Sequence, residues 1–142
     1  MSKFLDRLDR ISRGSSSPMG FGSASRAEKT PSMALVGLLS HSYLDSASLL
    51  AEVGVDGVLI EGLDKGTQFR QVTNILGALP WGIGGKHLNE EIAKSHREQG
   101  CDFFAFSVDN ITSATLSEED SAYLLEIAPD LDDRSLRAIE CL

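Results

Sequence analysis

Charged side chains stand at the ends of the apolar runs in this sequence, and they are the candidates for chemistry. Glu61 closes one run, Lys86 follows another, and Asp109 follows a third. A carboxylate in such a position can ligate a metal or move a proton, and a lysine can neutralise a substrate anion or form a Schiff base. We predict that Glu61, Lys86 and Asp109 are catalytic. A divalent metal, if the protein uses one, would bind Glu61 and Asp109, and no other cofactor is indicated.

Smaller residues and histidines stand at the same places and could bind a ligand. Glycine lets a ligand approach the backbone closely and exposes amides to an anion. The predicted ligand-binding residues are His41, Gly84, Gly85, His87 and Ser107.

Each of these residues also has a structural interpretation. Glu61 could bond to neighbouring backbone amides or pair with a lysine. The glycines of "WGIGGKH" equally fit close packing between strands, and the "DN" at Asp109 is common in turns. His96 falls inside a predicted helix, where we expect a structural or exposed side chain.

Five apolar runs must position these residues, and they start about 20 to 24 residues apart. Most are continuously apolar, as expected of strands in a parallel sheet that is covered on both faces. The predicted strands are Ala34–Ser40, Asp56–Gly62, Pro80–Gly85, Asp102–Ser107 and Ala122–Ala128.

Helical patterns fill the gaps between the runs and would form the crossovers that parallel strands require. They cover Leu44–Ala51 and Phe69–Leu79, and a third begins at Leu88. The gap over 108–120 has little helical pattern, so an alternative is a helix that is capped near Ser117 and covers 118–128. A final helix is predicted through Leu136 and Ile139.

Two similar turns support repeated βα units. "AEVGVDG" and "REQGCD" each end a helix with glycine and carry an acid just before the next strand. Cys101, in the second turn, is expected to be a small buried core residue and not a ligand, because the sequence has no second cysteine at metal or redox spacing.

The N-terminal part differs in character from the rest. Apolar residues at helical spacing predict an amphipathic helix with Phe4, Leu5, Leu8 and Ile11 on one face. A stretch rich in Ser, Gly and Pro follows. We therefore divide the chain into a helix and linker over 1–31 and a βα-repeat domain over 32–142.

Composition limits the partners. A net charge of −8 disfavours nucleic acid, and the apolar runs are too short to span a membrane. The N-terminus lacks the apolar core of a secretory signal, so we expect a cytoplasmic protein.

The stretch "LLAEVGVDGVLIEGLD", Leu49–Asp64, resembles the second βα boundary of aldolase-type phosphate-binding TIM barrels, a group that includes the tryptophan synthase alpha chain and isocitrate lyase. The resemblance implies a partial barrel of about five βα units, whose open sheet edges would be covered by homo-oligomerisation or another association. The alternative fold is a five-stranded doubly wound sheet of flavodoxin type.

Both folds gather the predicted site residues at the carboxyl ends of the strands. We therefore expect the protein to bind a small anionic metabolite, and the resemblance implies C–C lyase, aldolase or isomerase chemistry. The alternative is a non-catalytic subunit or assembly module, in which the apolar face of the N-terminal helix binds a partner.

Overall fold

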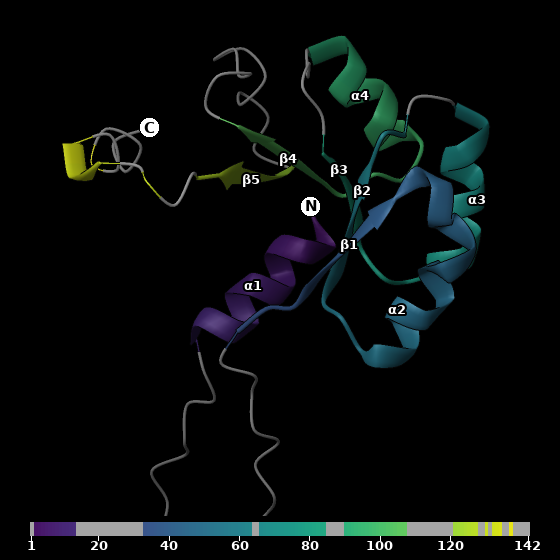
Figure 1. The fold of residues 1–142 in the computed structure, drawn as a ribbon, viewed down its shortest axis with the longest axis horizontal. Helices are drawn as coiled ribbons and strands as arrows, with labels where there is room; N and C mark the ends of the chain where they lie inside the picture. Colours follow the sequence, from purple (N-terminus) through teal and green to yellow (C-terminus); the bar gives the residue numbers. More distant parts are fainter. Residues whose placement is uncertain are drawn as a thin grey trace, which may run out of the picture.

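The structure is a computed structural model, and it describes residues 2–13, 33–63, 66–84, 90–107, 121–127, 130, 132–134 and 137. The helices are α1 (Lys3–Arg13), the 3-10 helix η1 (His41–Ser46), α2 (Ala47–Val53), α3 (Gly66–Leu76) and α4 (Glu90–Glu98). The strands are β1 (Val36–Ser40), β2 (Gly57–Glu61), β3 (Trp81–Gly84), β4 (Phe103–Ser107) and β5 (Ala122–Glu126) (Figure 1).

The five strands form one parallel sheet in the order β1-β2-β3-β4-β5, which is not closed. The predicted α/β class with parallel βα units is confirmed. The sequential order differs from the 2-1-3-4-5 order of flavodoxin-like sheets. The fifth apolar run is a strand, paired with β4 from Ala122 to Glu126, and not the alternative helix.

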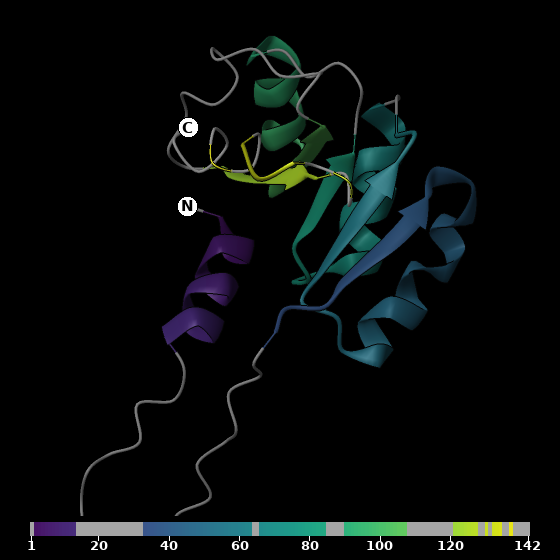
Figure 2. The same cartoon turned by 60° about the vertical axis from the view of Figure 1, so that its left-hand side comes forward.

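The crossover helices α2, α3 and α4 all pack on one face of the sheet, which we call the crossover face (Figures 1 and 2). Its core joins alternate strand residues, among them Val58 and Ile60, to apolar side chains of the helices such as Phe69 and Val72. Helix α3 ends at Leu76, and the prediction that it reaches Leu79 is wrong. The cause is Gly77, whose φ of 56° takes the backbone out of the helical region.

Helix α1 packs on the opposite face, which we call the α1 face (Figure 2). The ring of Phe4 stacks on Phe103 at 4.5 Å between centroids, and both rings are fully buried. Gly57 and Gly82 make room for them, because a β-carbon at either glycine would press against these rings. The amino-end half of the α1 face is therefore filled by aromatic side chains.

The acidic residues of the two similar turns, Asp56 and Asp102, form hydrogen bonds with distant parts of the chain. Asp102 accepts hydrogen bonds from the Ser2 hydroxyl and from the backbone amides of Lys3 and Phe4, so it caps the N-terminus of α1. Asp56 accepts one from the amide of Leu35, and Arg7 of α1 donates to the carbonyl of Asp56. These contacts fix α1 against the sheet.

Several predictions lie outside the described residues. These are the linker between α1 and β1, the crossover over 108–120 and the last helix through Leu136 and Ile139. Within the part of the chain that the structure describes, no helix is long and apolar enough to cross a membrane.

Candidate functional site

The carboxyl ends of β1, β2 and β3 place Ser40, Glu61 and Gly84 side by side, since the strand register pairs Ser40 with Glu61 and Glu61 with Gly84. The row continues across the sheet through Ala105 and Leu124. We call these five residues the carboxyl row. Successive side chains of a strand point to opposite faces of the sheet, so the row lies on the α1 face. It is two residues nearer to the carboxyl ends of the strands than the buried ring of Phe103.

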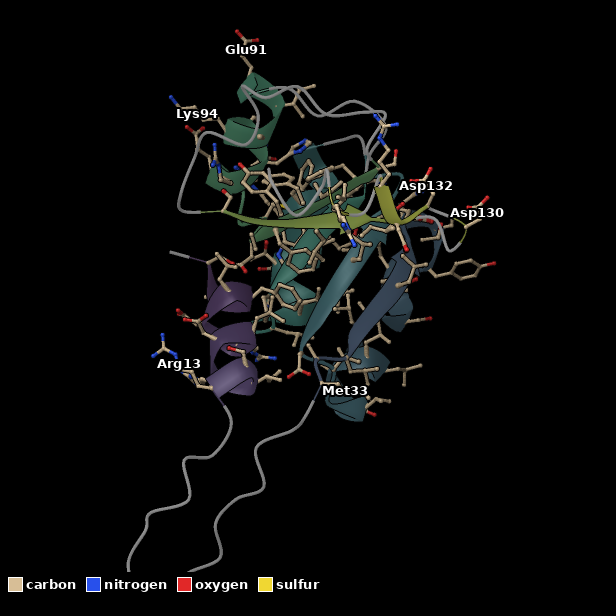
Figure 3. The ribbon with its side chains drawn as sticks, turned by 90° about the vertical axis from the view of Figure 1, so that its left-hand side faces the viewer. Arg13, Met33, Glu91, Lys94, Asp130 and Asp132 are labelled. Carbon is tan, nitrogen blue, oxygen red and sulfur yellow. The ribbon has the colours of Figure 1, made fainter. Side chains whose placement is uncertain are left out.

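The two ends of the molecule are separated by the length of the strands. Figure 3 shows Arg13, at the end of α1, and Met33, before β1, at one end, with Glu91 of α4 at the other. Strands β1–β4 run toward the Glu91 end, where the crossover helix after β3 begins. The carboxyl row thus lies at the opposite end from the point where α1 leads into its linker.

Glu61 is the charged member of the carboxyl row, and its side chain is exposed. Its Cγ lies beside Gly84, where a β-carbon would be 3.6 Å away. Among the described residues, neither a backbone amide nor a cation bonds to its carboxylate. The structural interpretation, in which Glu61 ties down the backbone or pairs with a lysine, therefore gains no support from this part of the chain.

His41 lies against Gly62, the residue that follows Glu61. Gly62 has a φ of 73°, and a β-carbon there would be 2.6 Å from Nδ1 of His41. Glycine suits both the left-handed backbone and the close approach of the imidazole. Of the predicted site residues, the structure thus brings Glu61 and Gly84 together, and it places His41 beside the next residue along the chain.

The two glycines of β3 have different reasons to be glycine. Position 82 requires glycine, because a β-carbon there would clash with the Phe103 ring. This agrees with the structural interpretation of "WGIGGKH", which attributed its glycines to close packing between strands. Gly84 has no positive φ, and a β-carbon there would make only ordinary contacts with Glu61 and Leu59. Neither backbone strain nor crowding by these neighbours requires glycine at position 84.

Ser107 ends β4 and pairs in register with Glu126, the last residue of β5. Alternation from Ala122 and Leu124 puts Glu126 on the α1 face, one step beyond the carboxyl row. Glu126 was not among the residues predicted from the sequence. The period of two along β5 was the signal that could have found it.

The remaining predicted site residues, Gly85, Lys86, His87 and Asp109, lie outside the described residues. Lys86 follows the end of β3 by two residues, and Asp109 follows the end of β4 by two. In the described ranges, no three His, Cys, Asp or Glu side chains come together as a metal would require.

Two buried titratable groups lie away from the carboxyl row. Burial raises the pKa of Cys101 to about 12, and its thiol donates to the carbonyl of Phe103. The prediction that Cys101 is a small buried core residue is confirmed. His96 of α4 lies against Phe69 with 4.7 Å between ring centroids, and burial lowers its pKa.

Comparison with known proteins does not extend these assignments. No family model, curated protein or solved structure matches the chain. The functional argument therefore rests on the carboxyl row and its surroundings.

Proposed function

We propose that the protein binds a small anionic metabolite at the carboxyl row. The observation that carries this proposal is the state of Glu61. It is an exposed carboxylate at a strand end, without a partner among the described residues, and its Cγ lies beside Gly84, where a β-carbon would make only ordinary contacts. Parallel sheets of this kind bind ligands at the carboxyl ends of their strands.

The roles of the residues follow from their chemistry. Glu61 acts as the base or as a metal ligand, and Asp109 is the second acid. Lys86 binds the anionic group or the carbonyl of the substrate. The remaining ligand-binding residues, on the same strand ends and the segments that follow them, are His41, Gly84, Gly85, His87 and Ser107.

The reaction proposed is C–C lyase or isomerase chemistry of the aldolase type. The resemblance of Leu49–Asp64 to aldolase-type TIM barrels supports this choice. The sequential strand order and the placement of α2, α3 and α4 on one face are compatible with consecutive units of such a barrel. Fold analogy alone does not fix a reaction, so the choice depends on a direct assay.

The test is to replace Glu61 with Gln and to measure binding and turnover together. Inorganic phosphate is titrated into the full-length chain while the backbone amides of Ser40, Glu61 and Gly84 are followed by NMR. Turnover is assayed with a panel of small oxo- and hydroxycarboxylates. We expect phosphate to shift these amides, and E61Q to lose turnover while its unfolding curve is unchanged.

The matched control is Glu52→Gln, on an exposed position of α2. It makes the same chemical change away from the carboxyl row and should keep both phosphate binding and turnover. Full turnover in E61Q would remove Glu61 from the mechanism. A phosphate titration that leaves the three amides unmoved would reject the anion site itself.

The rival function, an assembly module, requires the apolar face of α1 for a partner. Two residues of that face are used within the chain, because Phe4 is buried against Phe103 and Leu8 packs on the same cluster, whereas Leu5 stays partly exposed. This packing favours the ligand-binding proposal.

A further inference from the structure

We infer that the open edge of β1 pairs with the same edge of a second copy of the chain, which joins the two five-stranded sheets across a two-fold axis. The contact would be made by the β1 surface, which we define as Met33–Val53 and which contains β1, η1 and α2. This inference goes beyond the proposed function and does not depend on any ligand of the carboxyl row.

Exposed apolar side chains are concentrated on the β1 surface. It contains six of the nine large apolar residues that are exposed in the described part of the chain, namely Met33, Leu35, Leu38, Tyr43, Leu49 and Val53. Protein interfaces of standard size take about 20 to 30 residues from each partner, and Met33–Val53 has this length. The segment is thus long enough to supply one side of a specific interface.

Charge favours a second copy of the chain as the partner of this surface. The stretch from Met33 to Leu44 contains no Asp, Glu, Lys or Arg, although the chain as a whole carries a net charge of −8. Two copies that approach at β1 therefore avoid the repulsion that acts between other parts of their surfaces. β1 also lacks the lysine, proline or bulge with which edge strands commonly prevent pairing, since its register with β2 is unbroken from Val36 to Ser40.

The hydrogen bonds of the sheet show which backbone groups of β1 face the open edge. The amide of Val58 donates to the carbonyl just before β3, so the next residue, Leu59, directs its backbone groups toward β1. In a parallel pair, the residue opposite directs its own groups away, and the register places Leu38 opposite Leu59. Leu38 therefore presents its N–H and C=O at the open edge, and so do Val36 and Ser40, two residues away on either side.

A second copy of β1 that runs in the antiparallel direction complements these groups. A two-fold axis through Leu38, perpendicular to the sheet, places this residue opposite Leu38 of the second copy and Val36 opposite Ser40. Residues opposed in this way exchange both of their backbone hydrogen bonds. All the outward N–H and C=O groups of Val36, Leu38 and Ser40 are then paired, and no other centre pairs all of them within β1.

Helix α2 fits the same arrangement. The crossover places α2 over β1 and β2, where Leu50 lies against Gly37, and α3 packs beside it (Figure 1). Leu49 and Val53 are more than half exposed, so they lie on sides of α2 that neither the sheet nor α3 covers. Neighbouring strands are about 4.8 Å apart, which would put the two copies of α2 about 10 Å apart, a normal distance for packed helices. The exposed apolar side chains of α2 thus gain a partner in the dimer.

Oxidative crosslinking of the full-length chain tests this pairing. In a Cys141→Ser background, Cys101 is buried, so a newly introduced cysteine reports the contact. Leu38→Cys would place two thiols on residues about 5.5 Å apart between Cα atoms, within the range of a disulfide. Ser40→Cys is the matched control on the same strand, because the two copies of this position would lie about 13 Å apart. We expect a crosslinked dimer from Leu38→Cys and none from Ser40→Cys.

Sedimentation velocity measures the dimer without a crosslink. We expect Val53→Lys to raise the dissociation constant of the dimer at least about tenfold, because it places a charge in the contact. Ser48→Lys makes the same change in charge at an exposed position about 140° around α2 from Val53, and it should leave the dissociation constant unchanged. An unfolding curve for each variant shows that the helix is intact.

The inference is overturned by either of two results. An unaltered chain that stays monomeric at every concentration rejects the dimer. A dimer in which Leu38→Cys fails to crosslink, or in which Ser40→Cys crosslinks equally well, places the second copy elsewhere, such as at the β5 edge. Neither result bears on the phosphate titration, so the ligand site at the carboxyl row is tested separately.

Discussion

His96 shows how a single partly buried imidazole can set a pH dependence. Its Nδ1 atom is buried and has no hydrogen-bond partner among the described residues, and its ring lies against Phe69. Burial disfavours the charged form, so the pKa of His96 lies below the ordinary value of 6.5. The folded chain therefore binds this proton less readily than the unfolded chain does.

The sign of the effect on stability follows from linkage. Above pH 6.5 the imidazole is neutral in both states, and its contribution to stability is fully present. As the pH falls below 6.5 the unfolded state is protonated first, and stability is lost until the pH has passed the lowered pKa. We expect His96→Phe to show a smaller loss of unfolding free energy than the unaltered chain between pH 8 and pH 5. Urea unfolding at several pH values measures this, and parallel curves for the two proteins would contradict it.

Cys101 should be chemically silent in the folded chain. With its pKa raised to about 12, only about one thiol in ten thousand is ionised at pH 8, and the side chain is buried. We expect a Cys141→Ser chain to show no reaction with a thiol reagent until urea unfolds it. Rapid labelling under native conditions would show that β4 opens locally.

At this scale the sequence predicted the type and place of Glu61 but not its neighbourhood. A carboxylate directly after a continuously apolar run marks a strand end. The contact between His41 and Gly62 depends on a backbone angle and on where the next segment turns. The role of Asp102 was also hidden, because its hydrogen-bond donors, the Ser2 hydroxyl and the backbone amides of Lys3 and Phe4, are distant in the sequence.

Strand β3 contains two glycines that should respond in opposite ways to the same substitution. Gly82→Ala forces a β-carbon against Phe103 and should lower the unfolding free energy by about 1 to 3 kcal/mol. Gly84→Ala meets only ordinary contacts and should leave stability unchanged or raise it by about 0.5 kcal/mol. Urea unfolding compares them.

Helix α1 depends on a cap from a distant turn. Asp102→Ala removes three hydrogen bonds at the helix N-terminus and should lower the unfolding free energy by about 1 to 2 kcal/mol. Hydrogen exchange at the Phe4 amide should accelerate at the same time. Asp9→Ala, which breaks an exposed ion pair with Arg13, is the control and should change stability by less than about 0.5 kcal/mol. Equal effects of the two substitutions would mean that the cap contributes little.

The elements were more predictable than the site because hydrophobic periodicity is local. All five strands were predicted, and each observed strand lies within its predicted range. The end of α3 was missed because Gly77 looks permissible inside a helix until its φ is known. For the apolar run that starts at Ala122, the sequence was compatible with a strand or a helix. A short apolar segment suits both structures, and only its pairing with a neighbouring strand distinguishes them.

The open sheet leaves two strand edges, at β1 and β5, and the first βα unit is rich in exposed apolar side chains. Leu38 of β1 is 64% exposed, and Val53 of α2 is 71% exposed. Unprotected edges of this kind promote association between chains.

The strand order itself could not be predicted, because a crossover can add its strand on either side of the previous one and periodicity does not record which.

We expect Leu38→Lys to reduce concentration-dependent association of the chain while changing its stability by less than about 0.5 kcal/mol. Sedimentation velocity over a range of concentrations measures the association. The control is Leu5→Lys on α1, a partly exposed apolar residue that is not part of the sheet. An unaltered chain that remains monomeric at every concentration would contradict the expectation.

The cap on α1 also has a consequence for synthesis. The amide of Phe4 and the carboxylate that binds it are separated by 98 residues. During synthesis the residues of α1 therefore leave the ribosome long before Asp102 and Phe103, the two residues on which α1 docks, have been made. During this interval the apolar side of the nascent helix has no docking surface of its own, and its burial must be among the last steps of folding.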